Sequence, residues 1–246
     1  MTKRTIHFFI DKMKSGEYFS QAGYSDAEWY CMLNVRGGEK TGLGQVLSNS
    51  HGARLTEILV RRRNDSTFIV AVPQCLFRLP QFDGNRTIDI FLRRRRLATD
   101  NWCERDMITD SIAEKGKLFP LISQLVTMPV VIIGNRHLKG LDFLQYKNFV
   151  EISSPNLHLE PNGIERAVEE AVTHYSPGTI YLVSAGVSAA VIIDKLHDIT
   201  PKSFKFDCGS IWDAFVGIGA QREWRANLYA DEKAYEIWVR RNITGK

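Results

Sequence analysis

Most of the short motifs that identify enzyme families are absent from this chain of 246 residues. It has no G-x-x-x-x-G-K-[ST] phosphate loop and no G-x-G-x-x-G dinucleotide fingerprint, which excludes a P-loop enzyme and a typical dinucleotide-binding domain. It also lacks a G-x-S-x-G elbow and an H-E-x-x-H pair, the signatures of serine hydrolases and zinc proteases. Any catalytic site must therefore be built from a less common pattern.

Cysteines are few and widely spaced, and no C-x-x-C occurs. The four are Cys31, Cys75, Cys103 and Cys208. This spacing argues against a zinc site and against a disulfide framework, so we expect reduced, buried thiols. Long apolar runs are missing too: the run from Ile6 to Ile10 is interrupted by His7 and is too short for a signal peptide, and none approaches a membrane span. We therefore expect a cytoplasmic protein.

The composition is that of an ordinary globular protein, with 44% hydrophobic and 24% charged residues and a net charge of +4. The length suits a single domain covering residues 1–246. Two basic runs, Arg61 to Arg63 and Arg93 to Arg96, could follow a nucleic-acid backbone. No zinc finger, RNP signature or helix-turn-helix accompanies them. Nucleic-acid binding is therefore the less favoured reading, and solvated surface is the simpler one.

The second half of the chain alternates between strand and helix patterns. A continuous apolar run predicts a buried strand over residues 129–133, and further strands are expected over residues 149–152, 179–183 and 204–207. Helical spacing predicts helices over 164–175 and 187–197, the first with Asn162 and Glu165 placed as in a capping box. The order strand, helix, strand, helix, strand indicates a parallel sheet covered by helices.

The first half is mixed. We expect a helix over residues 27–33 capped by Ser25 or Asp26, another over 43–60, and a buried strand over 68–72. Residues 88–92 are a further strand candidate, and 102–128 are expected to be helical with a break near Gly116. The predicted fold class is α/β, a Rossmann-like and mostly parallel sheet with helices on both faces.

Three segments follow predicted strands at the edge where open parallel sheets bind ligands. They are Gly134-Asn135, the stretch from Ser184 to Ser188, and Asp207-Cys208-Gly209-Ser210. The small residues from Ser184 to Ser188 lead into a helix N-terminus, which suits a phosphate, although a turn glycine there could serve packing alone. Asp207 could bind a ribose hydroxyl or cap the next turn, and the residues alone favour the cap.

Asp26 and Glu28 form a D-x-E pair directly before an apolar segment. On an extended segment both carboxylates would point to one side, where two hard oxygen ligands suit Mg²⁺ or Mn²⁺. At a helix start the pair would instead be a capping residue and a first-turn acid. The spacing by itself favours the capping interpretation.

Motifs near the two ends of the chain resemble the GT-D-type glycosyltransferases, a family first described as a domain of unknown function in bacterial protein glycosylation. Its first motif, R-[YF]-G-D-G-E, is similar to Gly23-Tyr24-Ser25-Asp26-Ala27-Glu28. Its later strand, L-G-P-T-A turn, helix and D-I-G-H resemble the segment from Val183 through His197 to Asp213. The chain departs from the family at Gly23, which replaces a basic residue, and at Ser210, which replaces the histidine. The likeness covers roughly residues 20–225.

The resemblance implies a metal-dependent glycosyltransferase that moves a sugar from a nucleotide-sugar donor, with a UDP-sugar expected, to a hydroxyl of a glycan, glycopeptide or other acceptor. In that reading Asp26 and Glu28 hold Mn²⁺ or Mg²⁺. From their position, Asp213 and Glu223 are candidates for the general base. The expected donor-binding residues are Tyr24, Ser184, Ala185, Gly186, Ser188, Asp207 and Gly209.

Two other functions remain open at this point. One is a non-catalytic α/β module that binds a nucleotide or phosphate and needs no divalent ion. The other is a nucleic-acid-associated protein that uses its arginine runs, whose binding would fall steeply with salt.

Overall fold

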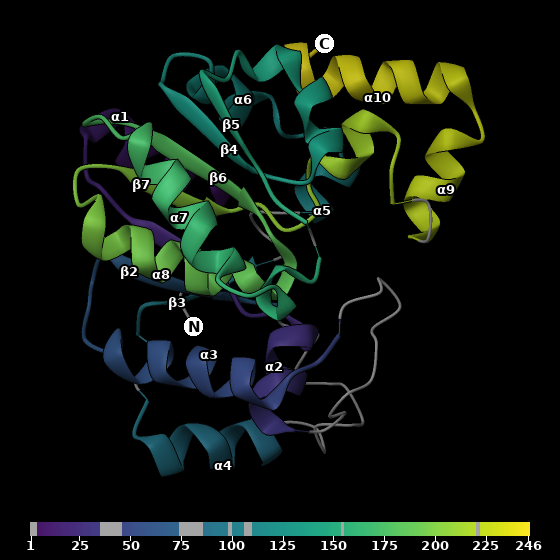
Figure 1. Cartoon of the computed structure of the whole chain (residues 1–246). Helices are drawn as coiled ribbons and strands as arrows, with labels where there is room; N and C mark the ends of the chain where they lie inside the picture. The colour runs from purple at the N-terminus through teal and green to yellow at the C-terminus, as the bar shows by residue number, and fades with distance from the viewer. Residues whose placement is uncertain are drawn as a thin grey trace.

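The computed structural model describes residues 4–34, 46–73, 86–97, 100–105, 110–153, 155–219 and 222–246. Within these ranges seven strands form one sheet in the order β3-β2-β1-β7-β6-β4-β5, and every pairing is parallel (Figure 1). The strands are β1 (Ser20–Gly23), β2 (Phe68–Val72), β3 (Trp102–Glu104), β4 (Val130–Gly134), β5 (Asn148–Glu151), β6 (Ile180–Ser184) and β7 (Phe204–Asp207). The predicted α/β class with a parallel sheet is confirmed.

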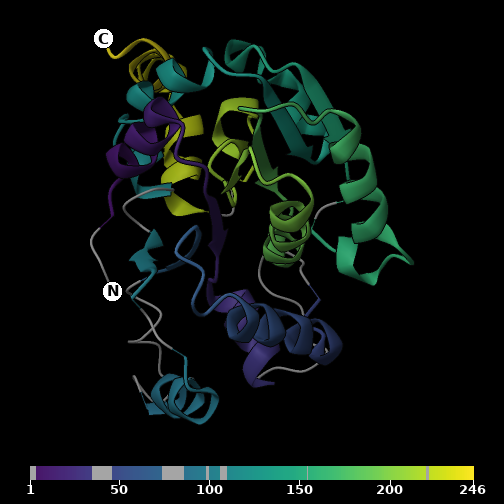
Figure 2. The same ribbon diagram turned by 90° about the vertical axis from the view of Figure 1, so that its left-hand side faces the viewer.

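Helices cover both faces of the sheet (Figures 1 and 2). One face packs against α2 (Asp26–Leu33), α3 (Asn49–Arg61), α7 (Gly163–Thr173) and α8 (Ala189–Ile199). The other packs against α1 (Ile6–Ser15), α5 (Asp110–Glu114), α6 (Phe119–Leu125) and α10 (Glu232–Thr244). The two remaining α-helices of the described ranges are α4 (Arg86–Arg95) and α9 (Glu223–Tyr229).

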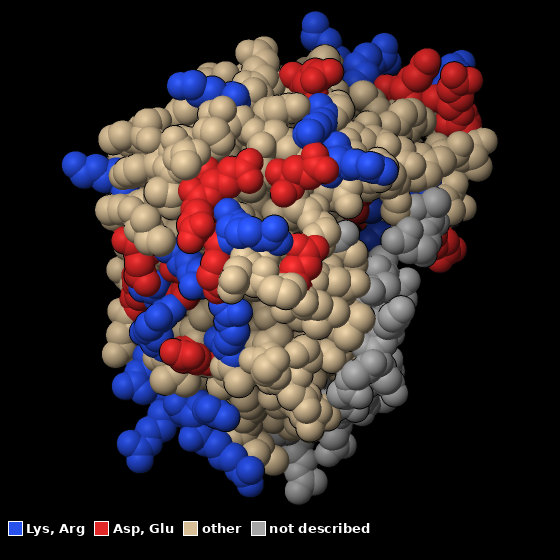
Figure 3. Space-filling view, viewed as in Figure 1, with Lys and Arg blue, Asp and Glu red and all other residues tan. Residues whose placement is uncertain are grey.

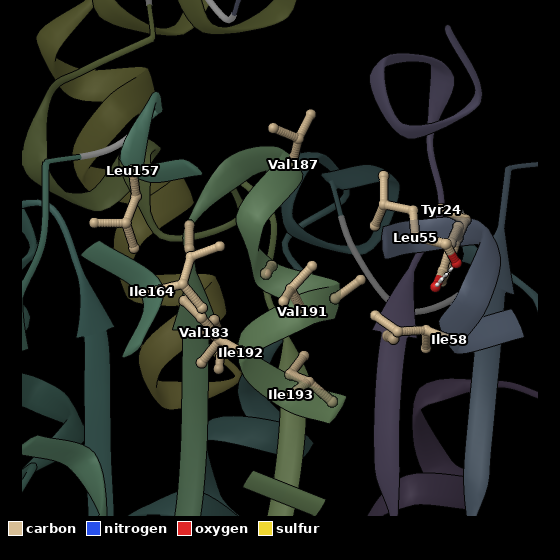
Figure 4. Packing of buried hydrophobic residues seen from close by; sticks show 14 of the residues in the cluster. Tyr24, Leu55, Ile58, Leu157, Ile164, Val183, Val187, Val191, Ile192 and Ile193 are labelled. Atoms are coloured by element: carbon tan, nitrogen blue, oxygen red, sulfur yellow. Dashed lines mark hydrogen bonds between the residues drawn. The ribbon is translucent and has the colours of Figure 1, made fainter. Parts of the chain in front are cut away.

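Alternating side chains on each strand divide the core into two layers. On β6, Tyr181 and Val183 belong to the layer under α7 and α8, whereas Ile180 and Leu182 belong to the layer under α1, α6 and α10. This is the period-2 alternation of a strand buried on both sides. Figure 4 shows how Val183 of β6 meets Ile192 of α8 in the first layer, beside α3. The apolar runs at residues 130–133 and 180–183 therefore form strands that are buried on both faces.

Two of the expected elements in the first half are wrong. Residues 88–92 belong to helix α4 rather than a strand, because Ile88, Phe91 and Leu92 recur at helical spacing and pack on the core. Residues 102–104 form strand β3 rather than the start of a helix, since they pair with β2 at the edge of the sheet. The break expected near Gly116 is confirmed between α5 and α6, where this glycine has a φ of +65°.

Helix starts differ in detail from the sequence predictions. Glu28 accepts a hydrogen bond from the backbone N–H of Ser25, the N-cap of α2, as expected for a first-turn acid. Asn162 precedes α7 in a left-handed conformation without a side-chain capping bond, so the capping box predicted there does not form. Helix α3 begins at Asn49, and residues 43–45 of its predicted span lie outside the described residues.

Cys31, Cys103 and Cys208 are buried free thiols, as expected, and Cys75 lies outside the described residues. Among the helices that the structure describes, none combines the length and apolar character needed to cross a bilayer.

Candidate functional site

The carboxyl ends of the parallel strands meet at one edge of the sheet, where α/β proteins bind ligands. Strands β4 and β6 are neighbours, but the chain leaves β4 for β5 on one side and β6 for β7 on the other. Their last residues, Gly134 and Ser184, therefore flank a topological switch point. The central strands β1 and β7 end beside them, at Gly23 and Asp207. The three segments that the sequence predicted as ligand-binding therefore lie along a single edge of the sheet.

Asp207 joins the two central strands at this edge. Its Oδ2 accepts the backbone N–H of Gly23 at 2.8 Å, and its Oδ1 accepts that of Gly209 at 2.8 Å. The side chain is 3% exposed. Both oxygens therefore receive backbone hydrogen bonds, which matches the capping interpretation and fixes the carboxylate within the expected donor site.

Arg105, which the sequence did not single out, reaches this carboxylate from the edge strand. It follows the last residue of β3, and its side chain contacts Ser25 Oγ and lies 3.5 Å from Asp207 Oδ1. A Cβ atom on Gly23 or on Gly209 would come within 2.7 Å of Arg105. The sequence pointed to this arginine only indirectly, through Gly23, a glycine at the position where the family has a basic residue.

Asp26 and Glu28 lie on helix α2, not on an extended segment. Asp26 is exposed at the first helical position, whereas Glu28 is 5% exposed and accepts the Ser25 N–H at 2.7 Å. Positions two apart on a helix are rotated by about 200°, so the two carboxylates point to different sides. Burial, opposed by the charge of Arg105, raises the pKa of Glu28 to about 7.

These acids do not fit a divalent ion by themselves. A site for Mg²⁺ or Mn²⁺ needs several oxygen ligands converging on one point, and one of this pair faces solvent while the other caps a helix. Among the residues that the structure describes, no group of three His, Cys, Asp or Glu side chains is placed to hold a metal. The metal role of Asp26 and Glu28 therefore stays a prediction, because the described residues do not supply the other ligands that the ion needs.

The segment after β6 forms a 3₁₀ turn, η7 (Gly186–Ser188), that leads into α8. Gly186 has a φ of +55°, a conformation that favours glycine. The hydroxyls of Ser184 and Ser188 are buried and have no hydrogen-bond partner among the described residues. Ala185 is buried in the core. The turn therefore offers two unpaired hydroxyls at the switch point, beside the predicted donor site.

Tyr24 is placed in the core rather than at an open surface. Its ring is fully buried, and its hydroxyl donates to the carbonyl oxygen of Leu55 at 3.2 Å (Figure 4). Burial raises its pKa well above the usual value. The residue therefore holds α3 against the end of β1.

A pair of histidines, also missed in the sequence, supports the η7 turn. His51 Nε2 donates to the carbonyl oxygen of Val187 at 2.8 Å, and its ring lies 4.6 Å from that of His158. Burial lowers the pKa of His51 to about 4 and also lowers that of His158. The His51 ring is therefore neutral at physiological pH, and its hydrogen bond ties α3 to the turn.

The two candidates for the general base lie after β7. Asp213 begins η8 (Asp213–Val216) and forms an ion pair with the buried Arg225 at 3.4 Å. The same arginine donates to the carbonyl oxygen of Ser210, three residues beyond Asp207. Glu223 is exposed in the first turn of α9. Asp213 is thus connected to the Asp207 loop through Arg225, while Glu223 faces solvent.

The first arginine run is largely occupied by structural ion pairs. Arg61 and Arg62 both contact Asp194 of α8, and Arg62 also pairs with Asp198 at 2.6 Å. In Figure 3 acidic and basic side chains alternate over this part of the surface, and basic side chains gather below it, where α4 ends with Arg93 to Arg95. A continuous nucleic-acid track through both runs is therefore not supported.

No protein-family model matches the chain, and no curated protein matches its sequence. Solved structures do match. One, described as a new glycosyltransferase (DUF1792) from Streptococcus sanguinis, is 15% identical with a TM-score of 0.57, covering 86% of this chain and 82% of that chain. A selenomethionine-substituted structure of domain of unknown function 1792 is 13% identical with a TM-score of 0.55, covering 94% and 82%. A third, described as a highly conserved domain with a distinct glycosyltransferase fold, has the same values. The chain therefore has the fold of these proteins, as the sequence resemblance predicted.

Proposed function

We propose that this protein is a glycosyltransferase that moves a sugar from a nucleotide-sugar donor to a hydroxyl group of a glycan, glycopeptide or other acceptor. The observation that carries the proposal is the shared fold, which extends over 86% of this chain and 82% of a structure described as a glycosyltransferase. The position of Asp207, Arg105 and the unpaired serine hydroxyls at the carboxyl edge of that sheet supports it.

In the proposed reaction the bond between the anomeric carbon of the sugar and the β-phosphate oxygen breaks, and its electron pair leaves with the nucleoside diphosphate. The acceptor oxygen forms a new bond to the anomeric carbon and gives its proton to a base. Asp213 and Glu223 remain the candidates for that base. Ser184 and Ser188 are proposed to donate hydrogen bonds to the donor at the switch point, and the Asp207 loop is proposed to border its sugar or ribose.

The dependence on Mn²⁺ or Mg²⁺ implied by the resemblance is retained as a prediction, and a UDP-sugar is retained as the expected donor. No step above is assigned to the ion, because the described residues do not assemble its ligands.

The test is turnover of a panel of nucleotide sugars with glycan and glycopeptide acceptors, followed by release of the nucleoside diphosphate. We expect turnover with donors of one base, and a loss of at least about tenfold in Asp207→Asn, because an amide nitrogen would face a backbone N–H there. Glu170→Gln, an exposed acid on α7, is the matched control and should retain full activity. Binding without turnover would instead indicate the non-catalytic nucleotide-binding module.

A further inference from the structure

Helix α4 and the residue after it carry the whole net positive charge of the chain. The segment from Arg86 to Arg96 has five arginines and one acid, Asp89. The full chain has 32 lysines and arginines against 28 aspartates and glutamates, so the rest of the chain is balanced at 27 of each. Charge of one sign is therefore gathered on one helix instead of being spread over the surface, which is typical of a surface that binds an anionic partner.

The arginines at the end of α4 do not act as structural ion pairs. Arg93 to Arg96 are all exposed, and no ion pair within the described ranges includes any of them. By contrast, Arg61 and Arg62 of the first run both contact Asp194 of α8. The positive charge of α4 is therefore not neutralised by the acids that the structure describes.

The inner face of α4 is anchored to the protein, which leaves its outer face open. Phe91 packs on Trp29 of α2, with ring centroids 5.6 Å apart. Ile90 is 41% exposed, and Arg93 and Arg94 lie three and four positions after it, on the same side of the helix. Figures 1 and 2 both show α4 as the outermost helix at one end of the molecule. The outer face of α4 is therefore accessible to a flat surface.

We propose that this outer face, formed by Ile90, Arg93 and Arg94 and extended by the exposed Arg96, docks the protein on the anionic surface of a phospholipid bilayer. The guanidinium groups bind lipid phosphates, whose oxygens match their planar fork of donors. The Ile90 side chain enters the boundary between headgroups and acyl chains. Four adjacent arginines on an amphipathic helix are typical of proteins that bind acidic lipids. This docking does not depend on the transfer reaction proposed above.

The exposed isoleucine favours a bilayer over a nucleic acid as the partner. An aliphatic side chain among cations gains free energy when it leaves water at a membrane interface. Single-stranded nucleic acids instead stack their bases on exposed aromatic rings. Among the large apolar side chains that are exposed in the described ranges, α4 contributes Ile90 and no aromatic residue. The arginines of α3 that would lengthen a nucleic-acid track are paired with α8.

Cosedimentation with phospholipid vesicles tests the inference. The vesicles contain phosphatidylcholine alone or with about one third phosphatidylglycerol, an acidic lipid. We expect wild type to bind only the acidic vesicles, and binding to fall at least about tenfold when salt rises from about 0.1 to 0.5 M. The triple variant Arg93→Gln/Arg94→Gln/Arg96→Gln should bind at least about tenfold more weakly. Ile90→Ser should bind about threefold more weakly, because less apolar surface leaves water.

The matched control is Lys202→Gln/Lys233→Gln/Arg240→Gln, which removes three exposed charges from other elements and should bind like wild type. Urea unfolding shows whether each variant is folded, and Arg94→Gln alone serves if the α4 triple variant is not. An equal loss of binding in the two triple variants would mean that net charge alone drives binding and would overturn the inference. So would wild type that does not bind acidic vesicles, Ile90→Ser that binds like wild type, or tighter binding to duplex DNA or single-stranded RNA than to acidic vesicles.

Discussion

The backbone N–H of Gly23 donates to Asp207 Oδ2 across 2.8 Å, and this bond ties the end of β1 to the end of β7. The two residues are 184 positions apart in the chain. They lie together because β1, the first strand, pairs directly with β7, the last. The candidate site therefore depends on a contact between the first and the last strand in chain order, and residues near both ends of the chain determine its shape.

Gly23→Ala is expected to disturb this contact directly. The added Cβ would lie 2.5 Å from Asp207 Oδ2 and 2.7 Å from Arg105 Cζ, so both groups would have to move. We expect a loss of about 1–3 kcal/mol in the free energy of unfolding by urea. Gly140→Ala is the control, because its Cβ would meet only Val216 at an ordinary 3.4 Å. Equal stability of the two variants would show that the site can relax around the extra methyl group.

Gly52→Ala is expected to separate α3 from α2. An alanine normally stabilises a helix relative to glycine by about 1 kcal/mol. At this position, however, the Cβ would lie 2.1 Å from the carbonyl oxygen of Cys31, and backbone atoms cannot rotate away. We expect a net loss of about 1–3 kcal/mol in the free energy of unfolding, with the sign opposite to helix propensity.

The adjacent Ala53 provides the comparison for that prediction. It is exposed on the same helix, so Ala53→Gly should cost only the propensity difference of about 1 kcal/mol. If Gly52→Ala stabilised the protein in a thermal melt, the close approach of α2 and α3 would not be a constraint.

Strands β4 and β6 could be predicted because each is a continuous apolar run, as in Val130 to Ile133. Strand β1 could not. Its sequence, Ser20-Gln21-Ala22-Gly23, contains no β-branched or aromatic residue, and it is a strand because β2 and β7 pair with it on both sides. Tertiary pairing determined the conformation there, and local propensity did not.

The candidate site was only partly predictable for a related reason. The sequence brought forward Asp207 and the D-x-E pair. The spacing favoured a helix start for Asp26 and Glu28, which the structure has, whereas the metal role came from the family resemblance. Arg105 was missed because it is 80 residues from Ser25 and 102 from Asp207 in the chain. Nothing local marks it, and only the strand order brings it to them.

Lys205 should make stability increase with pH above neutrality. The side chain is 1% exposed, and burial lowers its pKa from 10.5 to about 7, although its ammonium donates to the carbonyl oxygens of Thr200 and Ser203. Below about pH 7 the Lys205 amine is protonated in both the folded and the unfolded chain. Between about 7 and 10.5 only the unfolded chain binds this proton, so the free energy of unfolding rises with pH by up to about 1.4 kcal/mol per unit.

Urea unfolding at pH 7, 8 and 9 measures that slope. Other groups contribute to the total, so the informative quantity is the difference between wild type and Lys205→Met, which removes the titrating amine. Lys202→Met, at an exposed position in the preceding turn, should keep the wild-type slope. Identical slopes in wild type and Lys205→Met would mean that this lysine stays charged in the folded protein.

Asn242 is expected to be the main polar attachment of α10 to the rest of the protein. It is fully buried; its Oδ1 accepts the backbone N–H of Leu118, and its Nδ2 donates to the carbonyl oxygens of Ala113 and Trp238. In Asn242→Ala the Leu118 N–H loses its acceptor in the core, whereas Ala113 keeps the indole N–H of Trp238 at 2.7 Å.

One buried donor left unpaired costs about 1–3 kcal/mol, and the missing side chain also leaves a cavity, so we expect at least about 2 kcal/mol lost on urea unfolding. Asn227→Ala, at an exposed position on α9, should change stability by less than about 0.5 kcal/mol. Because α10 packs Trp238 against Phe215, with ring centroids 4.6 Å apart, loosening this helix should also alter tryptophan fluorescence before global unfolding. A single transition in Asn242→Ala, with stability equal to wild type, would show that the apolar contacts alone hold α10 in place.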